Sequence, residues 1–114
     1  MSSRFISTGQ QLRQGDVLTS EDGNVKAVFQ HDGNFVIYKS SSTPTWHSNT
    51  VCDRPYRIVL LEDNNLVMYS KANKPLWATD TYCNQTSERM RLTVTNEGTL
   101  VLDRDGGTIW TSGK

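Results

Sequence analysis

Hydrophobic and polar residues alternate along three short stretches of the chain, and each stretch is interrupted by a pair of turn-forming residues. In the first stretch, residues 25–30 lead through Asp32-Gly33 into residues 34–38. Alternation with a period of two is typical of a half-buried strand, and Asp-Gly between two such runs is a strong hairpin signal. Asp63-Asn64 and Glu97-Gly98 occupy the equivalent places further along the chain. The pattern therefore predicts three β-hairpins and an all-β fold.

The same alternation separates the two faces of each hairpin. One face has the larger apolar side chains, which we expect to form the core: Phe29, Phe35, Ile37, Leu60, Leu66, Met68, Val94, Leu100 and Leu102. The other face of the first hairpin presents Gln30, Asn34, Val36 and Tyr38. Three small sheets cannot each bury a face alone, so the hairpins are expected to pack against one another.

A tryptophan follows each hairpin at the same position, as Trp46, Trp77 and Trp110. We expect these three large apolar side chains to share a central core, the alternative being that they stack on a sugar. The chain of 114 residues is interpreted as a single domain, residues 1–114, with internal repeats over about residues 25–50, 56–81 and 90–114.

Charge and hydropathy exclude several classes of partner. Twelve Lys and Arg balance twelve Asp and Glu, and no segment of the sequence concentrates one sign. That balance argues against nucleic acid and against electrostatic attachment to membranes, both of which need clustered cations. No apolar run approaches the ~20 residues of a membrane span. The N-terminus also lacks the apolar stretch of a secretory signal, which leaves a cytoplasmic protein, a removed signal or unconventional export.

Cys52 and Cys83 each lie six residues after a repeat tryptophan and are therefore equivalent positions in two repeats. The pair could form a disulfide or remain as two free thiols, because equivalence alone does not bring two Cα atoms within bridging distance. Two cysteines are too few for a metal site, and no metal or other cofactor is expected.

A polar set on the first hairpin has the chemistry of a sugar site. It consists of Gln30, Asp32, Asn34, Val36 and Tyr38. Sugar hydroxyls both donate and accept hydrogen bonds; Gln and Asn offer both functions, Asp accepts, and Tyr does either. The alternative is an ordinary hairpin in which Asp and Asn only form the turn. That alternative does not explain Gln30 and Tyr38.

These five residues resemble the mannose-binding signature of the monocot bulb lectins, the lily-type or snowdrop-like family. The likeness extends from Phe5 to Trp110, and among animal members it is greatest to the lily-type lectins of fish skin and mucus. The resemblance implies a β-prism II fold, with three four-stranded antiparallel sheets around a pseudo-threefold axis. It also implies calcium-independent binding of mannose, with the polar side chains bonding its hydroxyls and Val36 contacting its ring carbons.

The other two copies of the motif are incomplete. The second keeps Asp63, Asn65, Val67 and Tyr69 but has Leu61 where the first has Gln30, so we expect a weaker site. The third has Thr95, Glu97, Thr99, Val101 and Asp103, of which only the valine matches, and we expect no mannose binding there.

The sequence therefore favours a mannose-binding lectin over the other functional classes. No catalytic residue is assigned, because neither His31 nor His47 has an orienting group or an oxyanion element in the sequence. The alternative function is a protein-interaction module on the same scaffold with weak or lost sugar binding. The resemblance further implies mannose-rich glycans or glycoproteins as partners, a homodimer, and an extracellular role in mucosal or innate defence.

Overall fold

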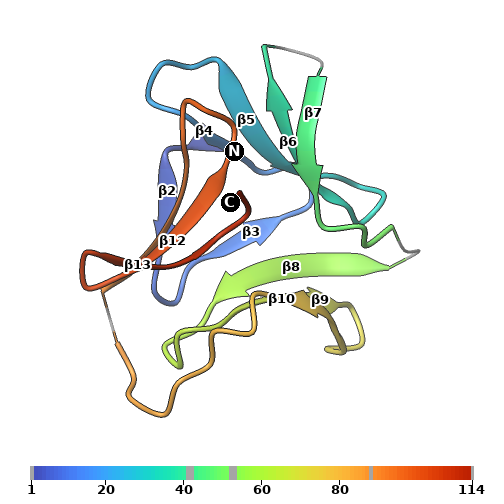
Figure 1. Ribbon diagram of the computed structural model, residues 1–114. Helices are drawn as coiled ribbons and strands as arrows, with labels where there is room; N and C mark the ends of the chain where they lie inside the picture. Colours follow the sequence, from blue (N-terminus) through green and yellow to red (C-terminus); the bar gives the residue numbers. More distant parts are fainter. Residues whose placement is uncertain (1, 41–42, 52–53, 88, 114) are drawn as a thin grey trace.

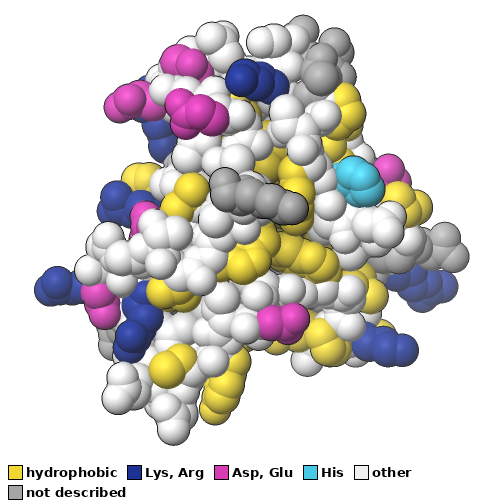
Figure 2. Space-filling view, viewed as in Figure 1, with side chains coloured by type: hydrophobic (Ala, Val, Ile, Leu, Met, Phe, Trp, Pro, Cys, Tyr) yellow, Lys and Arg dark blue, Asp and Glu magenta, His cyan; other side chains and the backbone are white. Residues whose placement is uncertain are grey.

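The protein is described by a computed structural model covering residues 2–40, 43–51, 54–87 and 89–113. Strands are the only regular elements in these segments, and they form three sheets arranged around a common centre (Figure 1). The all-β prediction is confirmed. Figure 2 shows the same side of the molecule, with hydrophobic side chains along the centre where the three sheets meet.

Each sheet takes three consecutive strands from one hairpin and the tryptophan segment that follows it. The first sheet contains β5 (Val25–Phe29), β6 (Phe35–Lys39) and β7 (Thr43–His47). The second contains β8 (Pro55–Leu60), β9 (Leu66–Ser70) and β10 (Pro75–Ala78). The third contains β11 (Met90–Val94), β12 (Leu100–Arg104) and β13 (Gly107–Thr111).

The N-terminal segment supplies the fourth strand of all three sheets. β2 (Phe5–Ser7) pairs with β11, β3 (Gln11–Arg13) with β8, and β4 (Val17–Thr19) with β5, all antiparallel. The two-residue strand β1 (Ser2–Ser3) adds a short parallel pairing to β4. A single extended segment therefore connects the three sheets.

The core is formed by the face that the alternation predicted. All nine predicted core side chains are at most 4% exposed. Each N-terminal strand adds one buried residue to them, namely Ile6, Leu12 and Leu18. Period-two alternation is the reason, since it places every second side chain on the inner face.

The three hairpins turn at residues with positive φ, as the sequence predicted. Gly33 has φ of 93°, Asn64 of 78° and Gly98 of 95°. Glycine adopts this conformation without steric cost, and asparagine tolerates it better than most residues.

The three tryptophans meet at the centre of the molecule, one from each sheet. The ring centroids of Trp46 and Trp77 are 5.7 Å apart, those of Trp46 and Trp110 6.2 Å, and those of Trp77 and Trp110 6.0 Å. All three pairs are edge-to-face, and all three side chains are half-buried against the core. The expected shared centre is therefore present, although its rings remain partly accessible to solvent.

Candidate functional site

The first hairpin brings its five predicted site residues together on the outer face of one sheet. Gln30 follows β5, Asp32 lies in the turn, and Asn34 precedes β6, which contains Val36 and Tyr38. The backbone N–H of Gln30 donates to the carbonyl of Asn34 at 2.9 Å, which closes the hairpin at this point.

Gln30 and Tyr38 hydrogen-bond to each other. The Gln30 Nε2 donates to the Tyr38 hydroxyl, and this hydrogen bond links the residue after β5 to a residue within β6. Val36 lies between them in the alternating pattern and is 4% exposed. Because the tyrosine oxygen accepts from the glutamine, its own proton remains available to an incoming acceptor.

Asn34 is fixed by the segment that follows Trp46. Its Oδ1 accepts from the backbone N–H groups of Asn49 at 2.9 Å and Thr50 at 3.3 Å, and from the Ser48 hydroxyl at 3.3 Å. With the oxygen engaged in this way, the Nδ2 group is the part of Asn34 that can address a ligand. Asp32 is exposed, and its Oδ1 accepts from the Asn34 backbone N–H at 3.0 Å, which leaves Oδ2 as a further acceptor.

Ser48 and Thr50 support the site but were not among the predicted residues. The Thr50 hydroxyl donates to the carbonyl of Gly33 at 2.6 Å, and the Phe35 backbone N–H donates to the Ser48 hydroxyl at 3.0 Å. A sequence signal for them exists, because Ser48-Asn49-Thr50 after the first tryptophan is repeated as Thr79-Asp80-Thr81 after the second.

The second hairpin reproduces this support. The Asp63 Oδ1 accepts from the Asn65 backbone N–H at 3.0 Å. The Asn65 Oδ1 in turn accepts from the Thr79 hydroxyl at 3.2 Å and the Thr81 backbone N–H at 3.3 Å. The Thr81 hydroxyl donates to the carbonyl of Asn64 at 2.6 Å, as Thr50 does in the first hairpin.

The second hairpin differs from the first around its tyrosine. Leu61 replaces Gln30 and offers Tyr69 no hydrogen bond. Instead, the Arg57 guanidinium carbon lies 5.5 Å from the centroid of the Tyr69 ring. Val67, the fourth retained residue, is 5% exposed, much like Val36.

In the third hairpin the equivalent side chains bond to one another or to their neighbours. The hydroxyls of Thr95 and Thr99 are 2.8 Å apart, and the Asp103 Oδ1 accepts from the Thr108 hydroxyl at 2.9 Å. Glu97 is exposed in the turn, and Val101 is half-buried.

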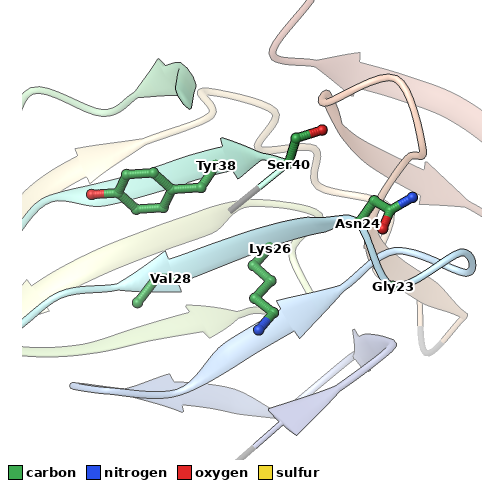
Figure 3. Close-up of a pocket in the computed structure, with 6 residues that line it drawn as sticks. All are labelled: Gly23, Asn24, Lys26, Val28, Tyr38 and Ser40. Atoms are coloured by element: carbon green, nitrogen blue, oxygen red, sulfur yellow. The ribbon is translucent and has the colours of Figure 1, made fainter. Parts of the chain in front are cut away.

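A hollow of about 630 Å³ adjoins the first site at Tyr38 (Figure 3). Lys26 and Val28 of β5 line it beside the tyrosine ring, with Asn24 and Ser40 at its other end. This volume is within the ~300–1,000 Å³ of small-ligand sites, so the outer face of this sheet has room for more than a single hydroxyl contact.

The described residues show no disulfide, metal site or membrane-spanning helix that would change this description of the site. Cys52 lies outside the described residues, so the structure does not bear on its pairing with Cys83, which is half-buried. Among the described residues no group of His, Cys, Asp and Glu side chains is arranged to hold a metal ion. Nor do these residues include a helix long and apolar enough to cross a lipid bilayer.

Known proteins resemble this chain over nearly its whole length, although no family model matches it. It is 42% identical over 110 residues to the B-type lectin plumieribetin of Scorpaena plumieri, a match that covers 96% of this chain and 95% of the relative. Among solved structures, monomeric monocot mannose-binding lectins from Gastrodia elata superpose with a TM-score of 0.85 at 25% identity, covering 97% of both chains. The mannose-specific agglutinin of snowdrop (Galanthus nivalis), solved with methyl-α-D-mannoside, has a TM-score of 0.78 at 27% identity, covering 97% of this chain and 96% of its own.

These matches confirm both the β-prism II architecture and the resemblance found in the sequence. The chain belongs to the B-type, or bulb-type, lectin family and is not an enzyme.

Proposed function

We propose that the protein is a calcium-independent lectin that binds mannose-containing glycans, chiefly through Gln30, Asp32, Asn34, Val36 and Tyr38. The observation that supports this most is the way in which Asn34 is held. Three donors occupy its Oδ1, which leaves its Nδ2 donors for a ligand, and the Asp32 carboxylate that caps its backbone N–H keeps Oδ2 as an acceptor.

This arrangement suits a pair of neighbouring sugar hydroxyls. An amide donor next to a carboxylate acceptor can bond two vicinal hydroxyls at once, and the Tyr38 O–H and the Gln30 amide can bond a third. A site of this kind discriminates between epimers, because a misplaced hydroxyl leaves polar groups unpaired. Its few hydrogen bonds to the sugar replace hydrogen bonds to water, so the net gain is small. We expect a dissociation constant near millimolar for a single mannose, a binding free energy of about −4 kcal/mol.

The second site, Asp63, Asn65, Val67 and Tyr69, is proposed to bind mannose more weakly. Loss of the glutamine contact at Leu61 removes roughly 0.5–1.5 kcal/mol. The third set is proposed to be inactive, because Thr99 and Asp103 use their polar groups within the hairpin.

Relatives support the choice of ligand. The snowdrop agglutinin was solved with methyl-α-D-mannoside and the Polygonatum cyrtonema lectin with monomannoside, each at 27% identity to this chain. By the same family resemblance we propose an extracellular role in mucosal defence and a homodimer. In the single chain, β13 pairs with its own β12, so dimerisation is not needed to complete the third sheet.

The proposal is tested by mannose-agarose retention and by calorimetry with methyl-α-mannoside, both in buffer containing EDTA. We expect the protein to bind, Asp32→Ala to abolish most of the binding, and Asp63→Ala to reduce the number of sites with little effect on the stronger one. A folded protein that ignores mannose in EDTA would leave the protein-interaction module as the better interpretation. Binding lost only upon chelation would contradict the calcium-free mechanism.

A further inference from the structure

A groove rich in basic side chains lies between the turn of the first hairpin, the start of β8 and the end of β9. Two adjoining hollows of about 310 and 330 Å³ form it, and they share Gln14, His31 and Lys71. We call this region the basic groove and define it by Arg13, Gln14, His31, Arg54, Tyr56 and Lys71.

The fold creates this concentration of charge from residues far apart in the sequence. Arg13, Arg54 and Lys71 bring three cations together in a chain whose formal net charge is zero. No Asp or Glu of the described segments lines either hollow. In Figure 2, Lys and Arg side chains are visible at the right-hand edge near the start of β8, whereas acidic side chains gather at the upper left over the β4–β5 loop.

Two of the basic residues are neighbours through the backbone. The Lys71 N–H donates to the carbonyl of Arg54 at 3.2 Å, so these two exposed residues start from hydrogen-bonded backbone positions. Both side chains line the same hollow, so an anion bound there interacts favourably with both charges.

Arg13 is oriented by an aromatic ring. Its guanidinium carbon lies 4.6 Å from the centroid of the Tyr56 ring. Stacking of this kind leaves the N–H edge of the guanidinium free for a bidentate contact with a carboxylate, sulfate or phosphate.

Gln14 connects the two walls of the groove. Its side-chain nitrogen donates to the carbonyl of Pro55 in the second sheet. Its Oε1 is 3.4 Å from the His31 Nδ1 in the first hairpin. The groove is therefore held together by contacts between the sheets and does not consist of unconnected surface lysines.

The basic groove adjoins the residues of both predicted sugar sites. His31 is between Gln30 and Asp32 in the chain, and the Arg57 guanidinium carbon lies 5.9 Å from the ring centroid of Tyr56 in the groove and 5.5 Å from that of Tyr69 in the second site. A saccharide held at either site could extend into the groove. Three cations in a hollow of this size suit one or two anionic groups; they are too few for the run of phosphates that nucleic-acid binding uses.

We propose that the basic groove binds the sulfate or carboxylate groups of an acidic saccharide. The choice of a saccharide as the bearer of the anion rests on the proposed sugar-binding function, whereas the anion site itself does not. The ligand class of this protein thus extends from neutral mannose glycans to negatively charged ones.

The test measures binding of a heparin-derived hexasaccharide by calorimetry in EDTA at about 0.15 M ionic strength. We expect Lys71→Ala and Arg54→Ala each to weaken binding about tenfold, since each removes a charge-assisted contact. Lys39→Ala is the matched control, because it removes the same charge from an exposed position at the far end of β6. That variant should change affinity less than twofold.

Variants of the sugar sites separate this proposal from the proposed function. Asp32→Asn combined with Asp63→Asn should abolish mannose binding without abolishing hexasaccharide binding, which Lys71→Ala should still weaken about tenfold in that background. If the wild type ignores mannose but binds the hexasaccharide with the expected variant pattern, the basic groove stands and the mannose assignment falls.

Three results would overturn the inference. One is no measurable hexasaccharide binding by the wild type. Another is equal weakening by Lys39→Ala and Lys71→Ala, which would mean a general charge effect. The last is equally tight binding of a single-stranded RNA of the same charge, which would mean that the groove does not select saccharides.

Discussion

Thr50 and Thr81 support the asparagines of the two proposed sugar sites without belonging to the predicted sets. Each hydroxyl donates at 2.6 Å to a carbonyl of the hairpin turn, and each backbone N–H donates at 3.3 Å to the asparagine Oδ1. The third hairpin has Thr99 in place of the asparagine, and Lys114 stands in the sequence where the threonine would follow its tryptophan, so neither residue of the pair is present. The asparagine and the threonine are thus both present in two repeats and both absent from the third, as expected if the threonine positions the asparagine.

Replacing the hydroxyl of Thr50 by a methyl group should therefore affect both stability and sugar binding. Thr50→Val leaves the buried Gly33 carbonyl without its donor, which costs about 1–3 kcal/mol in unfolding free energy. Mannose affinity at the first site should fall as well, because the Thr50 hydroxyl anchors the segment whose backbone N–H groups donate to the Asn34 Oδ1. Thermal unfolding and methyl-α-mannoside titration measure the two effects.

Two comparisons identify a positioning role for Thr50. Thr50→Ser keeps the hydroxyl and should retain mannose affinity, whereas Thr86→Val makes the same chemical change at an exposed residue and should alter neither quantity. Equal sugar binding by Thr50→Val and the wild type would show that Asn34 keeps its position unaided.

At the scale of elements, the hairpins were predictable and the N-terminal strands were not. Residues 25–38 show alternation, a turn signal and a buried face within one short window. β2, β3 and β4 have three residues each, too few to show a period, and the partners of β2 and β3 lie in distant parts of the sequence. Thr50 was missed for a related reason, since its partner Gly33 is 17 residues away along the chain.

The loop between β4 and β5 is stabilised by the charge of Asp22. Backbone donation from Asn24 and donation from the Ser20 hydroxyl hold the pKa of this carboxyl below its usual value. A lowered pKa means that the ionised form stabilises the fold above the ordinary aspartate pKa, and that this contribution is lost as the pH falls through the folded-state pKa.

Asp22→Asn should therefore lower stability at pH 7, with a difference from the wild type that shrinks as the pH falls below the ordinary aspartate pKa of about 3.9. Urea unfolding at pH 7 and at successively lower pH values measures the change. Glu21→Gln removes the same charge from the neighbouring exposed residue and controls for net charge. A difference between wild type and Asp22→Asn that persists undiminished at low pH would show that the lost stability is not electrostatic.

At the scale of the whole molecule, the three sheets are joined through their tryptophans. Each ring contacts the other two edge-to-face, so any two of them form a coupled pair. In a double-mutant cycle of Trp46→Leu and Trp77→Leu, we expect a coupling of about 1 kcal/mol. Denaturant unfolding followed by circular dichroism measures it.

Tyr82 provides the control for this cycle. It is 66% exposed, so Tyr82→Leu makes a similar aromatic-to-leucine change away from the cluster. Its effect should add to that of Trp46→Leu within about 0.3–0.5 kcal/mol. Full additivity in the tryptophan cycle would mean that the three sheets are stable independently of their shared centre.

The pairing of β2 with β11 makes the molecule a closed ring of three repeats. Ile6 lies opposite Leu92, so β2 has no partner until β11 has been synthesised. Such distant contacts slow folding and favour a late, all-or-none assembly. Closure also fixes the number of repeats, since each sheet uses one strand of the N-terminal segment. An open solenoid can lengthen by duplicating a unit. A fourth repeat here would lack a strand from the N-terminal segment to complete its sheet. Changes in binding specificity are therefore confined to the side chains on the three outer faces.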